Sequence, residues 1–208
     1  MIYLIGGPPK CGKTTLAKQI SKTAGIPWVS TDTLQNVIKP YIPEQNHPAK
    51  FPLSSLRYES NDEKYAKHSA DELIVAYRHQ AKTLHPAIEA FVASEIIEGN
   101  DYIVEGFHLE PELISKLVAE FPEKVRGVLV IKKDPTAFVE NIHSSTTPND
   151  WIIKKTKDEA TFPKIAAVIT AYSAQLENAA KQHDLKVFCV DQNFTTELKA
   201  AETYLVSV

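Results

Sequence analysis

Gly7-Pro8-Pro9-Lys10-Cys11-Gly12-Lys13-Thr14 is the most informative stretch of this 208-residue chain. It fits the pattern G-x-x-x-x-G-K-[ST], in which glycines let the backbone N–H groups of a tight loop approach phosphate oxygens. The apolar run Ile2–Ile5 before it predicts a strand, and a helical pattern with Leu16 and Ile20 begins at Lys13. A helix that begins there presents its positive N-terminus to an anion. The stretch therefore predicts a nucleotide phosphate site.

Two side chains of this loop suit the chemistry of such a site. Lys13 can reach the β- and γ-phosphates of a nucleotide, and the Thr14 hydroxyl can join the shell of a Mg²⁺ ion. We interpret Cys11 as a small filler rather than a reactive thiol. A Gly/Pro turn with an incidental lysine is the alternative interpretation. We expect nucleotide contacts from Gly7, Pro8, Pro9, Lys10, Cys11, Gly12, Lys13, Thr14 and Thr15.

Composition narrows the class of protein. The chain is 43% hydrophobic and 24% charged with a net charge of −3, which is typical of one globular domain with its own core. Its basic residues are 20 Lys and 3 Arg, so we expect no nucleic-acid partner. The two cysteines do not form a disulfide framework. No stretch has the roughly 20 apolar residues of a membrane span. We expect a cytoplasmic protein without a targeting segment or a membrane partner.

Short apolar runs alternate with helical patterns along the chain. Strands that alternate with helices indicate a parallel sheet covered on both faces, and hence an α/β fold. The five runs that predict strands are Ile2–Ile5, Trp28–Ser30, Tyr102–Val104, Val125–Ile131 and Val187–Val190.

Two long stretches interrupt this alternation. Residues 40–60 contain four prolines and little periodicity, which predicts a loop-rich excursion. A helical pattern follows over residues 61–84, and we expect His85-Pro86 to end it, because proline removes a backbone donor and clashes with the preceding turn. A second helix then ends at Gly99. Residues 144–162 are polar and predict a mobile segment.

Asp32 follows the second strand run directly. The carboxyl ends of parallel strands face the ligand crevice of an open α/β sheet. A carboxylate there can accept the proton of a substrate hydroxyl or hold that hydroxyl in line with the γ-phosphate. The alternative is that Asp32 caps the helix that follows.

Val104-Glu105-Gly106-Phe107-His108 ends the third strand run. An acid at this place is suited to organising Mg²⁺ and its waters, and we assign that role to Glu105. The alternative is a solvated strand end. Gly106 would let the backbone turn sharply beneath the substrate. His108 is a candidate substrate contact, with a purely structural role as the alternative.

Three segments together resemble the P-loop small-molecule kinases. These are Gly7–Thr14, Ser30-Thr31-Asp32 and Val104–Pro111, and the last resembles the 2-phosphoglycerate kinase-like group in particular. Zeta toxins and adenylate kinases are more distant. Tyr77-Arg78-His79-Gln80 also resembles a helical segment of that group. The likeness covers roughly residues 1–120 by motif and the remainder only by the order of segments.

The resemblance implies one P-loop NTPase domain over residues 1–208, with a three-layer α/β/α fold and a five-stranded parallel sheet. It also implies a helical acceptor-binding insertion at about 37–98 and a lid at about 144–162. Arg57 and Arg78 lie in that insertion, and arginine suits an anionic acceptor. Kinases of this type bring lid arginines onto the transferred phosphate, whereas residues 133–208 contain none. Lys154, Lys155 and Lys157 either supply the charge of the missing lid arginines or form a solvated face.

The resulting hypothesis is an enzyme that transfers the γ-phosphate of ATP, with Mg²⁺, to a hydroxyl or phosphate of a small anionic metabolite. Its catalytic residues would be Lys13, Asp32 and Glu105, its metal residues Thr14 and Glu105, and its substrate residues Asp32, Arg57, Arg78, Gly106 and His108. A nucleotide-dependent switch or ATPase with a protein partner is one alternative, and a nucleoside monophosphate kinase is another. The acceptor, the choice of ATP over GTP and the oligomeric state are not encoded in any motif of the chain.

Overall fold

The computed structural model describes residues 1–56, 58–146 and 150–206. Within these residues, five strands form one sheet in the order β2-β3-β1-β4-β5, and every neighbouring pair is parallel. The predicted five-stranded parallel sheet is confirmed. The strands are β1 (Ile2–Gly6), β2 (Trp28–Ser30), β3 (Tyr102–Glu105), β4 (Val125–Ile131) and β5 (Val187–Cys189).

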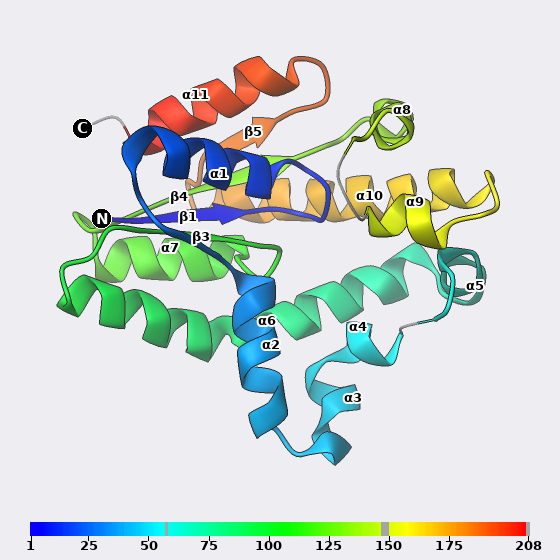
Figure 1. Cartoon of the computed structure of the whole chain (residues 1–208), viewed down its shortest axis with the longest axis horizontal. Helices are drawn as coiled ribbons and strands as arrows, with labels where there is room; N and C mark the ends of the chain where they lie inside the picture. Colours follow the sequence, from blue (N-terminus) through cyan, green and yellow to red (C-terminus); the bar gives the residue numbers. More distant parts are fainter. Residues whose placement is uncertain (57, 147–149, 207–208) are drawn as a thin grey trace.

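Helices cover both faces of this sheet, which gives the predicted three-layer fold (Figure 1). One face carries α1 (Lys13–Ala24) and α11 (Phe194–Val206), which contact each other. The other face carries α6 (Ala70–Ile97), α7 (Pro111–Glu120) and α10 (Thr161–Gln182). The central strand β1 is buried along its whole length, because both of its faces lie against helices.

The remaining elements extend beyond the sheet on the side of its carboxyl ends (Figure 1). Instead of the loop expected over residues 40–60, the chain forms a succession of short helical turns. These turns are η1 (Lys39–Tyr41), η2 (Glu44–Asn46), α3 (His47–Lys50) and α4 (Pro52–Ser55). The other elements on this side are α2 (Thr31–Ile38), α5 (Asn61–Lys67), α8 (Pro135–His143) and α9 (Trp151–Lys155). Residues 147–149 of the predicted lid lie outside the described residues.

The helix break predicted at His85-Pro86 is wrong, because α6 runs without interruption for 28 residues and contains Pro86. A proline inside a helix costs about 3 kcal/mol. On the same helix, Leu84, Ile88 and Val92 are at most 1% exposed. Burying each of these side chains contributes roughly 1.5–3 kcal/mol, which is enough to offset the proline.

The break occurs earlier, at His68-Ser69. The Ser69 hydroxyl accepts a hydrogen bond from the Glu72 backbone N–H, and the Glu72 carboxylate accepts one from the Ser69 backbone N–H. This reciprocal capping box satisfies two N–H groups at the start of α6. It separates α5 from α6 and so allows α5 to take its own direction. Among the described residues, none of the helices combines the length and apolarity needed to cross a bilayer.

Candidate active site

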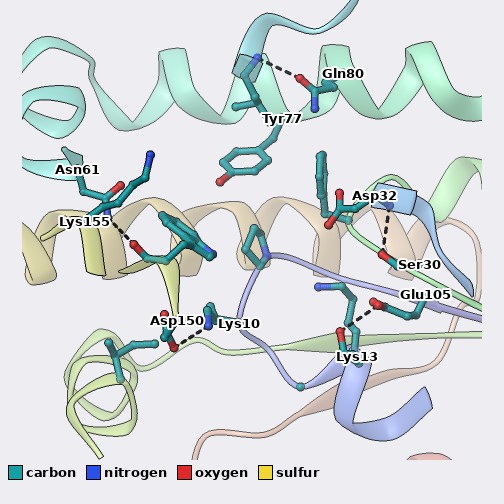
Figure 2. Close-up of a pocket in the computed structure, with 18 of the residues that line it drawn as sticks. Lys10, Lys13, Ser30, Asp32, Asn61, Tyr77, Gln80, Glu105, Asp150 and Lys155 are labelled. Carbon is teal, nitrogen blue, oxygen red and sulfur yellow. Dashed lines mark hydrogen bonds and ion pairs between the residues drawn. The ribbon is translucent and has the colours of Figure 1, made fainter. Parts of the chain in front are cut away.

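A cavity of about 1010 Å³ lies at the carboxyl ends of β1, β2 and β3. The loop after β1 and residues of α2, α5, α6 and α9 line it. Figure 2 shows Lys13 and Glu105 at one end of the cavity and Asn61 and Lys155 at the other, with the ring of Tyr77 between the two ends. We call these the phosphate end and the acceptor end.

Backbone geometry builds the phosphate end. Gly7 and Gly12 have φ angles of 132° and 96°, a region that favours glycine. A Cβ on Gly7 would lie 2.0 Å from the carbonyl oxygen of Val130, so the loop lies directly against β4. Gly12 is the N-cap of α1, as the motif predicted. Cys11 is fully buried, and burial raises the pKa of its thiol to about 11, so it stays protonated at neutral pH.

The two loop lysines have different partners. Lys13 is 7% exposed, and its ammonium group donates to the backbone carbonyl of Pro8 at 2.6 Å. Lys10 forms an ion pair of 2.6 Å with Asp150, which is also the N-cap of α9. That pair joins the phosphate loop to the segment predicted as a lid. Of the predicted nucleotide contacts, Pro9, Lys10, Gly12, Lys13, Thr14 and Thr15 line the cavity.

Thr14 and Glu105 meet at the phosphate end, as a shared metal role requires. The Thr14 hydroxyl donates to Oε1 of Glu105 at 2.9 Å. Glu105 is 4% exposed, and this burial raises the pKa of its carboxyl, while Lys13 and Thr14 act in the opposite direction. In the described part of the chain, no group of three or more acidic, His or Cys side chains could hold a metal ion on its own. Mg²⁺ is commonly held by one or two protein ligands together with phosphates and waters, and Thr14 and Glu105 fit that mode.

Asp32 lies on the first turn of α2 and lines the cavity with a side chain that is 65% exposed. The helix cap is Ser30, whose hydroxyl accepts a hydrogen bond from the backbone N–H of Asp32 at 3.2 Å. The capping alternative for Asp32 is therefore wrong, and its carboxylate is directed to the cavity. Burial first, and the Asp32 charge second, raise the pKa of Tyr77.

His108 does not line the cavity that holds Asp32. It is fully buried, bonded to the Thr31 hydroxyl through Nδ1 at 2.7 Å and to Oε1 of Gln35 through Nε2 at 3.1 Å. Oε1 of Gln35 also accepts from Gln80 at 2.6 Å, so the network assigns the proton of His108 to Nε2 and makes Thr31 a donor. Burial lowers the pKa of His108 to about 3, and the ring stays neutral. The network favours the structural alternative, in which His108 supports the start of α2.

Gly106 lines the cavity and brings the end of β3 against α2. Its φ is 156°, and a Cβ there would lie 1.7 Å from the Thr31 hydroxyl oxygen. A larger residue would therefore displace Thr31, the neighbour of Asp32. The close contact with Thr31 therefore explains the glycine more directly than the sharp turn expected from the sequence.

Of the two arginines predicted for the acceptor, only Arg78 belongs to the described residues. Arg78 pairs with Glu110 at 3.2 Å and with Glu112 at 3.3 Å, and it does not line the cavity. Glu110 is a buried carboxyl, which gives Arg78 a structural task. Arg57 lies outside the described residues. Of the three lysines predicted for the lid, Lys155 lines the cavity, and Lys154 and Lys157 do not.

Several cavity residues were missed by sequence reasoning. Tyr77 and Gln80 lie on α6, within the segment that resembles the kinase group, but neither was assigned to the site. Asn61 and Lys64 come from α5, and neither belongs to a motif. At the phosphate end, Phe194 lines the cavity at the start of α11, next to the loop after β5.

Comparison with known proteins agrees with this geometry. Residues 3–88 match the family model described as "ATPase family associated with various cellular activities (AAA)". The chain is 27% identical to mevalonate-3-phosphate 5-kinase of Thermoplasma acidophilum over 118 residues, which is 56% of this chain and 55% of that protein. It is 29% identical to 2-phosphoglycerate kinase of Methanopyrus kandleri over 140 residues, which is 64% of this chain and 40% of that protein.

The chain thus spans about half the length of these two curated relatives. Among solved structures, shikimate kinase from Bacteroides thetaiotaomicron superposes with a TM-score of 0.51 at 15% identity, covering 100% of this chain and 99% of that one. This likeness shows the fold. The resemblance to P-loop small-molecule kinases that the motifs indicated is confirmed.

Proposed function

We propose that this protein is a P-loop kinase that transfers the γ-phosphate of ATP to a hydroxyl group of a small molecule. The observation that carries this proposal is one continuous cavity that holds a phosphate loop and a separate carboxylate, Asp32. Similarity to two small-molecule kinases supports it. A nucleotide switch needs the phosphate loop, but it does not need a cavity that continues beyond the loop and is lined by aromatic and polar side chains.

Lys13 and Thr14 would hold the nucleotide and its metal. The ammonium group of Lys13 now donates to a loop carbonyl, and it can exchange this bond for phosphate oxygens without leaving the loop. When bound, Mg²⁺ neutralises the negative charge that develops on the phosphates. Glu105, together with the Thr14 hydroxyl, would orient the water ligands of that ion. Glu105 must be ionised for this role, which the neighbouring charge of Lys13 favours.

Asp32 would act on the acceptor. Its carboxylate accepts the hydrogen of the acceptor hydroxyl and holds the oxygen in line with the γ-phosphate. The oxygen then forms a bond to phosphorus, the bond between phosphorus and the leaving ADP oxygen breaks, and the hydroxyl proton passes to Asp32 and on to solvent. Because Asp32 is well exposed, solvent can receive this proton directly. We place this activity in the cytoplasm, as part of the same proposal.

The test is release of ADP from ATP and Mg²⁺, with and without pools of hydroxyl metabolites that include 2-phosphoglycerate and nucleoside monophosphates. We expect one pool to stimulate ADP release by the wild-type protein and not by Lys13→Ala. Splitting that pool then identifies the acceptor. ADP release that no pool stimulates, together with intact ATP binding, would contradict the proposal and favour a nucleotide switch with a protein partner.

A further inference from the structure

We propose that Lys64 binds an oxyanion of the acceptor, either a carboxylate or a phosphate ester, at the acceptor end of the cavity. The inference rests on the function proposed above and adds the chemical class of the substrate and the residue that selects it. It also replaces the assignment of Arg78 to this task, because Arg78 pairs with Glu110 and Glu112 outside the cavity.

Lys64 is a partly buried cation that lines the cavity without a carboxylate partner among the described residues. Its ammonium group lies 5.6 Å from the ring centre of Tyr65 and 6.0 Å from that of Tyr77. Burial lowers the pKa of this lysine to about 8, which is the direction expected for an ammonium group that has lost hydration. A partly dehydrated ammonium group gains most from an anion, and an anionic ligand would supply one.

Two other cations of the cavity, Lys13 and Lys10, already have partners. Lys13 donates to the Pro8 carbonyl, and Lys10 pairs with Asp150. Lys132 is 4% exposed and lies between the rings of Phe138 and Phe194, at 5.6 and 5.9 Å from their centres. An anion at the acceptor end would therefore meet Lys64 and the exposed Lys155 rather than Lys10 or Lys13 (Figure 2).

The helix that carries Lys64 is bonded to the lid helix α9. Asn61 is 4% exposed, and its amide donates to the Thr156 hydroxyl at 2.9 Å and to the carbonyls of Trp151 and Ile152 at 3.4 Å. The carboxylate of Asp62 accepts hydrogen bonds from the backbone N–H groups of residues 157 and 158. These contacts hold α9 against α5. Helix α9 contributes a second ammonium group to the same cavity, the exposed one of Lys155.

Tyr77 relates this anion site to the reacting end. Its ring lies next to Lys64, and Figure 2 shows the ring between Asn61 on one side and Asp32 on the other. One small acceptor lying along the ring can place a hydroxyl at Asp32 and an oxyanion at Lys64. Trp28, Tyr58, Phe107 and Trp151 also line the cavity. The acceptor class is therefore a compact hydroxy acid or hydroxyalkyl phosphate.

The test is calorimetric titration of the protein with four probes in saturating Mg²⁺ and ADP, which keeps anions out of the phosphate loop. The probes are glycerate with a carboxylate, glycerol 3-phosphate with a phosphate, 2-phosphoglycerate with both, and glycerol with neither. We expect at least one anionic probe to bind and glycerol not to bind. Glycerate and glycerol 3-phosphate then show which oxyanion the site prefers.

The variants identify the residue. Lys64→Met should lower the affinity for the anionic probe about 10- to 100-fold, which is the range expected for loss of a hydrogen bond to a charged group. Lys64→Arg keeps the charge and should retain most of the affinity. Lys154→Met is the matched control, because Lys154 is an exposed lysine of α9 outside the cavity lining, and it should bind as the wild type does. Thermal unfolding of each variant checks that it is folded.

Two results would overturn the inference: no anionic probe binds the wild-type protein, or folded Lys64→Met binds the probe as tightly as wild type. The proposed function can fail separately. Lys64-dependent binding without phosphoryl transfer to any acceptor would retain the anion site and reject the kinase. Transfer to an acceptor that is insensitive to Lys64→Met would retain the kinase and reject the anion site.

Discussion

The two ends of the cavity are built in different ways. At the phosphate end, glycine φ angles and close backbone contacts fix the loop, and the side chains of Lys13, Thr14 and Glu105 complete it. At the acceptor end, residues of α5, α6 and α9 form the walls. A backbone site leaves a fixed sequence pattern, because one misplaced Cβ blocks it. A side-chain site does not, so its specificity can change while the fold stays the same.

The largest expected effect is the loss of phosphoryl transfer between the two ends of the cavity. Asp32→Asn removes the acceptor of the hydroxyl proton and should lower the rate of phosphoryl transfer about 10²- to 10⁴-fold, with ATP affinity near normal. Steady-state kinetics and ATP titration measure the two quantities. Asp71→Asn is the matched control, an exposed aspartate in the first turn of α6. A parallel loss of ATP affinity would place Asp32 at the phosphate end instead.

The next effect tests the phosphate end alone. Lys13→Met should lower transfer about 10²- to 10³-fold, because it removes a charge that contacts the transferred phosphate. Lys22→Met, an exposed lysine in the last turn of the same helix, should leave the rate unchanged. In the calorimetric titration, both variants should bind the anionic probes with the affinity of the wild type. A lysine variant of α1 that loses acceptor binding as well would show that the ends are not independent.

Glu105→Gln should separate activity from stability. Burial raises the pKa of Glu105, so folding disfavours its ionised form. That destabilisation is absent at low pH and is fully present above the folded-state pKa. The neutral variant should therefore unfold at a higher temperature than the wild type at pH 8. We also expect its transfer rate to fall about 10- to 100-fold, because the Mg²⁺ waters lose their anionic partner. A variant that is less stable than wild type at pH 8 would contradict this account.

The last prediction concerns stability rather than activity, at the support beneath Asp32. His108 has a pKa of about 3 in the folded protein, below the ordinary value of 6.5. Its unfolded form binds the proton first, so stability should fall as pH decreases from 6.5 toward 3, by up to about 1.4 kcal/mol per pH unit. Urea unfolding at pH 7 and pH 5 measures the loss. His108→Gln should reduce it, and an equal loss in both proteins would show that His108 contributes nothing to the pH dependence.

The sequence predicted the phosphate end and the sheet because both depend on local patterns. Gly7 and Gly12 match positions where a side chain would clash, and the strands are apolar runs that the sheet buries. The break at Pro86 was predicted wrongly, because the packing of Leu84, Ile88 and Val92 outweighs a local preference. The role of Lys64 could not be predicted, since it depends on residues far away in the sequence, including Tyr77 and the contacts of Asn61 with α9.

The arginines illustrate the same limit. Their residue type suggested an anionic acceptor, yet the position of Arg78 on α6 directs it to Glu110. Sequence gives the chemistry that a side chain can perform, whereas the fold decides which partner it meets. The anion site that we propose uses a different residue for the chemistry that the arginines suggested.

Transfer of labelled phosphate tests the central claim most directly. The protein is incubated with ATP labelled at the γ-phosphate, Mg²⁺ and the stimulating metabolite pool, and the labelled products are separated. We predict label in an organic phosphate for the wild-type protein, and none above background for Lys13→Met or Asp32→Asn. Label that appears in inorganic phosphate alone would show hydrolysis without an acceptor and would contradict the account.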